Sequence, residues 1–83
     1  MKIAIQTGLN DLAELLKIKG YEVVPFREGG QDIRITILND IDEEYEEMDP
    51  VTFMGEQDEE MVLLDASRLS QKEILTYVEK YMQ

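Results

Sequence analysis

The first 26 residues follow a strand, helix, strand pattern, which constrains the fold of the chain more than any other feature. Residues 2–5 form a short apolar run that is typical of a buried strand. Between residues 9 and 16, apolar side chains recur at the spacing of one helix face, and Gly20 supplies the left-handed residue that commonly ends a helix. Residues 21–26 have the β-branched and aromatic composition of a second strand. The pattern therefore predicts an α/β fold.

The remaining residues predict two more strands and a terminal helix. Alternating isoleucines indicate a third strand over residues 33–37, and the apolar run 61–64 indicates a buried fourth strand. Between them we expect a short helix over residues 40–48 and an acidic loop over 51–60. Ser70 and Glu73 have capping-box spacing and predict the start of the last helix. We expect one small domain over residues 1–83, with about four strands and two main helices in β-α-β-β-(short α)-β-α order.

The pairing of the second and third strands has two solutions. Gly29 and Gly30 lie between them, and a Gly-Gly pair between strand-like runs is a hairpin signal. The connection is also shorter than a parallel crossover normally is, which favours antiparallel pairing. The alternative is a parallel arrangement with an unusually short crossover. The sheet is therefore expected to be mixed or mostly parallel, with strands two and three as a candidate hairpin.

The charge of the chain is concentrated in one segment. Residues 40–60 contain eleven acidic side chains and no Lys or Arg, whereas the rest of the sequence has eight acids and eight bases. Such an acidic segment disfavours binding to nucleic acids and to anionic membranes, because both need basic side chains. The chain has no Cys and no His, so thiol nucleophiles and Cys/His zinc sites are excluded. We expect a non-catalytic protein without a cofactor and, since no export signal or membrane span is recognisable, a cytoplasmic one.

A small number of residues are weak candidates for ligand binding. Carboxylates are ligands for hard cations, and Asp40, Asp42 and Asp65 are the candidates for a magnesium or calcium site. Thr7 and Gly8 stand where the first strand meets its helix, and free amides at a helix start can bind an anion. A domain that binds a divalent cation or a small anionic ligand at the carboxyl ends of its strands is therefore the alternative function.

The favoured function is a protein-interaction or oligomerising module. The apolar face of the last helix is wider than a sheet requires, and Tyr77 and Tyr81 lie on it. Leu15 and Ile18 lie off the apolar stripe of the first helix and add apolar surface. A domain this small gains stability from association, so self-association as a homodimer is the alternative to binding a different protein. The acidic side chains would either steer a basic partner or prevent unwanted association, and the candidates in the short helix are Glu43, Glu44, Glu46 and Glu47.

Both ends of the sequence carry a pattern that is similar to a known family. The pattern at the start is an apolar strand, Gly8-Leu9 and a helix closing on Gly20, and at the end it is Met54-Gly55, Gln57-Asp58 and a terminal helix containing Glu73-Ile74. This order resembles the YkuS family of small bacterial proteins. The middle of the chain departs from that family, since it has the isoleucine alternation and the acidic segment. The resemblance implies a compact α/β fold and a cytoplasmic location, and it implies no activity.

Overall fold

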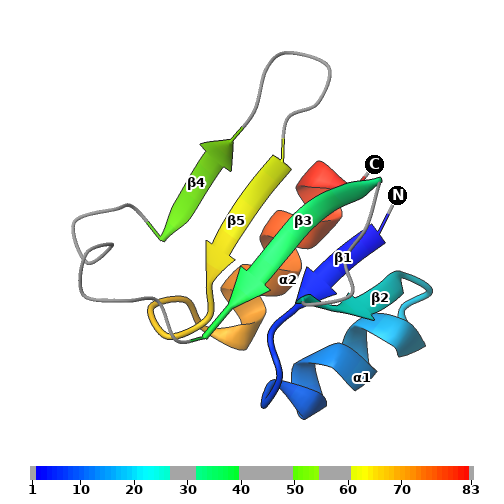
Figure 1. Ribbon diagram of the computed structural model, residues 1–83. Coiled ribbons are helices and arrows are strands. Elements are labelled where there is room, and N and C mark those ends of the chain that lie inside the picture. The colour runs from blue at the N-terminus through cyan, green and yellow to red at the C-terminus, as the bar shows by residue number, and fades with distance from the viewer. Residues whose placement is uncertain (1, 27–31, 40–49, 55–60, 83) are drawn as a thin grey trace.

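The computed structural model describes residues 2–26, 32–39, 50–54 and 61–82. These residues form one sheet and two helices, which confirms the α/β fold class (Figure 1). The elements in chain order are β1 (Lys2–Ile5), α1 (Asn10–Ile18), β2 (Glu22–Pro25), β3 (Ile33–Leu38), β4 (Val51–Met54), β5 (Met61–Asp65) and α2 (Gln71–Tyr81).

The strands are arranged in the order β2-β1-β3-β5-β4. β1 lies between β2 and β3 and is parallel to both, and β3 is parallel to β5. β4 is antiparallel to β5 and forms one edge of the sheet, while β2 forms the other. The expectation of a mixed, mostly parallel sheet is therefore confirmed.

The expected hairpin of the second and third strands is wrong. β2 and β3 do not pair with each other, because β1 separates them. β2 ends level with Ile5 and β3 starts level with Lys2. With a rise of ~3.3 Å per residue and a strand spacing of ~4.8 Å, the two ends are about 14 Å apart. A connection over residues 26–32 can reach that far, so a short parallel crossover is possible where the glycine pair suggested a hairpin.

The expected acidic loop over residues 51–60 is wrong for its first four residues, which form a strand. Val51–Met54 forms β4, whose residues pair with Met61–Leu64 of β5. The isolated run of four residues is too short to show a period in the sequence, and its strand conformation depends on its partner in the sheet. The expected helix over residues 40–48 lies outside the described residues.

The ends of both helices follow the sequence signals. Gly20 has a φ of +97°, as a left-handed residue after α1 requires, so an alanine there would strain the backbone. At the start of α2, the Ser70 hydroxyl accepts from the backbone N–H of Glu73 at 3.1 Å. The Glu73 carboxylate in turn accepts from the Ser70 N–H at 3.0 Å, which completes the expected capping box.

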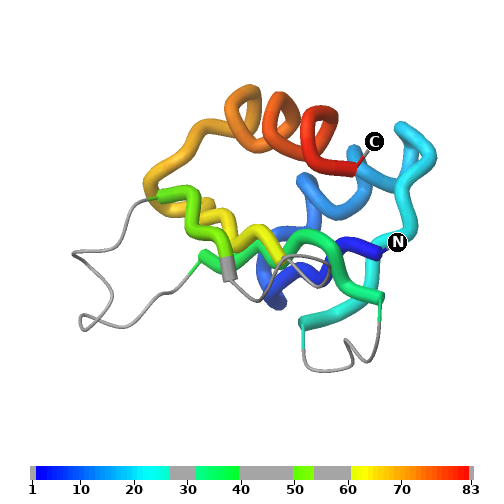
Figure 2. The backbone as a smooth tube through the Cα atoms, turned by 90° about the horizontal axis from the view of Figure 1, so that it is seen from above, coloured from blue at the N-terminus to red at the C-terminus, as the bar shows by residue number. Residues whose placement is uncertain are grey.

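One buried cluster joins both helices to the same face of the sheet (Figure 2). Leu12 and Leu16 of α1, together with Ile74 and Val78 of α2, supply its helical half. The strands supply alternate residues, namely Ile3, Ile5, Ile35, Ile37, Val62 and Leu64. Burial of these side chains removes apolar surface from water and is the main term that stabilises the fold.

The opposite face of the sheet carries a row of small and medium side chains. Ala4 and Thr36 are neighbours on β1 and β3 and are only 2% and 3% exposed. The Thr36 hydroxyl donates to the sulfur of Met61 at 3.0 Å, so its buried polar atom has a partner.

Candidate functional site

Three aromatic side chains form a contiguous surface where β4 meets α2. Tyr77 and Tyr81 are four residues apart on α2, which places them on the same helix face, and their rings stack with centroids 6.3 Å apart. Phe53 of β4 contacts Tyr81 edge-to-face, with centroids 5.3 Å apart and an interplanar angle of 78°. Such geometry is favourable for aromatic pairs. We call Phe53, Tyr77 and Tyr81 the aromatic edge.

Two basic side chains contact Tyr81. Lys80 places its ammonium group 5.3 Å from the centroid of the Tyr81 ring, within the range of a cation–π contact. Arg34 of β3 donates from Nε to the backbone carbonyl of Tyr81 at 3.1 Å and so ties the end of α2 to the sheet. Phe53 remains 50% exposed although it contacts Tyr81. The aromatic edge is therefore ordered by its contacts and accessible through Phe53.

The interaction residues predicted from the sequence fall into separate places. Tyr77 and Tyr81 are half-buried and form most of the aromatic edge. Ile18, at the end of α1, is 76% exposed, and Leu15 is half-buried beside it on the same helix. Sequence reasoning missed Phe53, because the four-residue run Val51–Met54 is too short to predict a strand. The four glutamates at positions 43, 44, 46 and 47 lie outside the described residues.

Asp65, one of the predicted cation ligands, bonds to residues of the turn that follows β5. It is buried at the end of β5, and its Oδ1 accepts from both the backbone N–H and the hydroxyl of Ser67, at 2.9 and 2.6 Å. Its Oδ2 lies 3.4 Å from Nε of Arg68. The carboxylate therefore organises the turn between β5 and α2. Asp40 and Asp42 lie outside the described residues, and within the described ranges there is no group of three or more His, Cys, Asp or Glu side chains suited to a metal ion.

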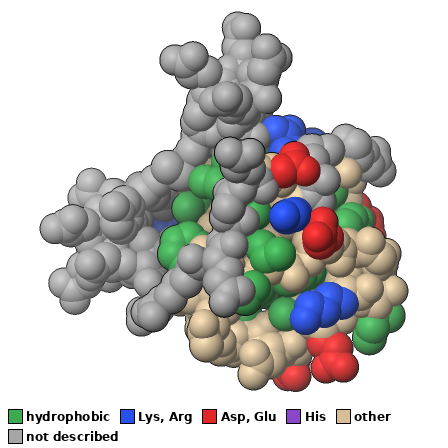
Figure 3. All heavy atoms as spheres, turned by 45° about the vertical axis from the view of Figure 1, so that its right-hand side comes forward, with side chains coloured by type: hydrophobic (Ala, Val, Ile, Leu, Met, Phe, Trp, Pro, Cys, Tyr) green, Lys and Arg blue, Asp and Glu red, His purple; other side chains and the backbone are tan. Residues whose placement is uncertain are grey.

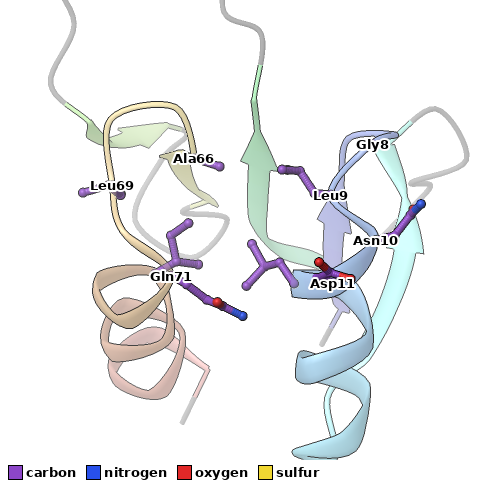
Figure 4. Close-up of a pocket in the computed structure, with 9 residues that line it drawn as sticks. Gly8, Leu9, Asn10, Asp11, Ala66, Leu69 and Gln71 are labelled. Carbon is purple, nitrogen blue, oxygen red and sulfur yellow. The ribbon is translucent and has the colours of Figure 1, made fainter.

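The predicted anion candidates lie beside two shallow cavities at the start of α1. Gly8, with a φ of +104°, lines a cavity of about 240 Å³ between the starts of α1 and α2. Figure 4 shows Asp11 and Gln71 pointing toward this space from the two helices. Thr7 lines a second cavity of about 200 Å³, which it shares with Lys17. Both volumes are below the ~300 Å³ of a typical small-ligand pocket, and the Asp11 carboxylate would repel an anion from the first.

The point in the sheet where an α/β fold usually binds ligands is bridged by a side chain. This point lies at the carboxyl ends of β1 and β3, because the chain continues from them in opposite directions. Here the amide oxygen of Gln6 accepts from the backbone N–H of Asn39 at 2.6 Å. Gln6 thus links the two strand ends across the position that a ligand would take.

The described surface gives no sign of a charged binding face on the side drawn in Figure 3. There, acidic and basic side chains alternate with hydrophobic ones, and neither sign forms a block. Neither described helix has the length and apolar character that crossing a membrane requires.

Comparison with known proteins identifies a family. A family model described as an uncharacterised protein family (UPF0180) matches residues 1–81. YkuS is a member of that family, so the resemblance seen in the sequence is confirmed. Comparisons with curated proteins and with solved structures gave no match.

Proposed function

Since the chain belongs to the uncharacterised protein family UPF0180, which supplies no activity to transfer, we propose from its geometry that it is a non-catalytic protein-interaction module. The proposed binding surface is the aromatic edge. One observation carries the proposal: Phe53 is half-exposed on an edge strand while it packs against Tyr81. Aromatic side chains are enriched where proteins bind each other, because they bury a large area with few rotatable bonds.

Isolated exposed apolar residues are common on protein surfaces, and Ile18 is such a residue. The aromatic edge differs because its three rings contact one another in a row, with Tyr81 in the middle. Lys80 contacts the Tyr81 ring, and Arg34 bonds to the Tyr81 backbone carbonyl. An ordered group of rings loses little side-chain entropy when a partner covers it. This pre-organisation supports binding at the aromatic edge rather than at Ile18.

The non-catalytic part of the proposal rests on the composition and on Asp65. The chain lacks Cys and His, so it has neither a thiol nucleophile nor the side chain best suited to proton transfer near neutral pH. The buried carboxylate of Asp65 is engaged by Ser67 and Arg68. A cytoplasmic location is also part of the proposal, and its support is the resemblance to YkuS.

Affinity capture with matched variants tests the proposal. Immobilised wild type and the variants Phe53→Lys, Ile18→Lys and Thr76→Lys would be exposed to the same lysate, and bound proteins identified by mass spectrometry. Thr76 is exposed on α2, so Thr76→Lys adds the same charge without altering the aromatic edge. We expect Phe53→Lys alone to lose the bound proteins. An identical set from wild type and a folded Phe53→Lys would contradict the proposal, and loss with Ile18→Lys instead would place the surface on α1.

A further inference from the structure

Among the described residues, no strand lies beside the outer edge of β4, which adjoins the aromatic edge. β4 is the last strand in the sheet order of the described residues (Figure 1). The Asp65 N–H donates to the Pro50 carbonyl at 2.9 Å, and β4 is antiparallel to β5. In an antiparallel pair every second residue points its N–H and C=O toward the partner strand. Pro50 and Thr52 therefore face β5, and the backbone groups of Val51 and Phe53 point away from the sheet.

The two edges of this sheet differ in how they are protected. Natural edge strands commonly carry charged residues or proline, which discourage another strand from adding. β2 has both, since Glu22 is charged and Pro25 has no N–H to donate. β4 has the sequence Val-Thr-Phe-Met and contains neither. The contrast indicates that β4, and not β2, is the edge open to an added strand.

The side chains beside the β4 backbone favour an apolar residue in such a strand. Val51 packs partly against the core, and Phe53 on the same face of the sheet contacts Tyr81. A residue directly opposite Phe53 in a new strand would have its Cβ about 5 Å away, which is contact distance for an aliphatic or aromatic side chain. Because side chains alternate along a strand, apolar residues are needed at every second position.

The acidic residues before and after β4 favour basic residues on both sides of the apolar stretch in the added strand. Residues 40–49 contain seven acids and residues 55–60 contain four, without any base, and these two segments join β4 at its two ends. Lysine or arginine on either side of the added strand would be attracted to them. A second copy adding through its own β4 would bring eleven acids against eleven, which opposes association.

We propose that β4 binds an extended segment of a partner protein by strand addition, and that this segment has apolar residues at alternate positions with Lys or Arg on both sides. The inference rests on the proposed function and specifies its partner. Main-chain hydrogen bonds to Val51 and Phe53 hold the segment, and the Phe53 ring selects its apolar residue. The negative charge that the sequence carries before and after β4 attracts a segment with basic ends through long-range electrostatics.

Selection from a displayed library of random peptides tests the proposed chemistry. The full chain is the bait, and peptides that also bind Phe53→Lys are removed. We expect the enriched sequences to combine apolar residues at alternate positions with basic flanks. Failure to enrich any peptide on wild type over Phe53→Lys, or enrichment of acidic or uncharged sequences, would overturn the inference. Sedimentation of the wild type and of Phe53→Lys is an additional test. A wild-type dimer that dissociates in Phe53→Lys would mean that β4 binds a second copy instead.

Backbone methylation of the best selected peptide tests the binding mode without any protein variant. N-methyl groups on the residues that bond to β4 should weaken binding about tenfold or more, while methylation at the alternate residues should change it little. Equal affinity of both methylated peptides would refute strand addition. If lysate capture depends on Phe53 but methylation has no effect, the aromatic edge stands as the binding surface and only the strand-addition inference fails. If capture does not depend on Phe53, the proposed function itself fails.

Discussion

Replacement of Asp65 separates a structural carboxylate from a cation ligand. The buried Oδ1 accepts two hydrogen bonds from Ser67, and each hydrogen bond to a charged group contributes ~1.5–3 kcal/mol. Ser67 is exposed and regains water when the carboxylate is removed, so the lower end applies and gives about 3 kcal/mol for Asp65→Ala. The contact to Arg68 adds less than about 1 kcal/mol, because that side chain is partly exposed.

Asp65→Asn is the matched variant, because it keeps an oxygen at the position of Oδ1. It removes the charge and replaces Oδ2, which faces Arg68, by an NH2 donor. We expect it to lose about 1 kcal/mol, since the Ser67 hydrogen bonds become neutral ones. Urea unfolding followed by circular dichroism measures both variants. A domain of this size has about 3–5 kcal/mol from its core, so Asp65→Ala should be close to unfolded at room temperature.

Two results would refute this reasoning. If Asp65→Ala is as stable as the wild type, the carboxylate does not organise the turn between β5 and α2. If Asp65→Asn is as damaging as Asp65→Ala, and the wild type gains stability in a saturable way on addition of Mg²⁺ or Ca²⁺, Asp65 is a cation ligand. Sodium chloride at matched ionic strength is the control, because it screens charge repulsion without specific binding.

Three other predictions concern the cap, the sheet and the acidic segment. Ser70→Ala should lower the free energy of unfolding in urea by about 1 kcal/mol. The Ser70 N–H, and to a smaller extent its hydroxyl, hold the pKa of Glu73 below its ordinary value. The Glu73 carboxylate therefore stabilises the fold above that ordinary value, and this stabilisation is lost as pH falls through the lowered pKa. Glu73→Gln should therefore flatten the acid limb of the stability profile, and an unchanged limb would contradict the cap assignment. Thr36→Val should change stability by less than about 1 kcal/mol by thermal unfolding, since the lost hydroxyl donates only to a sulfur, and a larger loss would show that this bond matters more. Neutralising the four acids of the expected short helix should keep the fold and raise its melting temperature at low salt, and these acids are Glu43, Glu44, Glu46 and Glu47. Cooperative loss of structure would mean that the carboxylates are structural.

The elements that local chemistry specifies could be predicted from the sequence. Gly20 follows the end of α1 as expected, and the capping box of Ser70 and Glu73 starts α2. Both could be predicted because such signals act within one helical turn. The buried strands β1 and β5 were visible as apolar runs. Pairing could not be read in the same way, since the position of β1 between β2 and β3 depends on contacts distant in sequence.

Only the helical part of the aromatic edge could be predicted from the sequence, because strand pairing depends on contacts between distant residues. Tyr77 and Tyr81 share a helix face by spacing alone, so the sequence indicated them. Phe53 joins them only because β4 pairs with β5 beside α2, and no local signal connects residues 53 and 81. Asp65 was a candidate ligand by residue type, and its partners Ser67 and Arg68 became evident only from the turn.

Amide hydrogen exchange at Val51 and Phe53 tests the central claim most directly. The measurement compares the free protein with the protein saturated by the best selected peptide, using exposed amides of β2 as the control. Strand addition predicts that exchange at Val51 and Phe53 slows about tenfold or more, because their outward N–H groups become hydrogen-bonded, while β2 is unchanged. Unchanged exchange at both residues in the saturated complex would contradict the account.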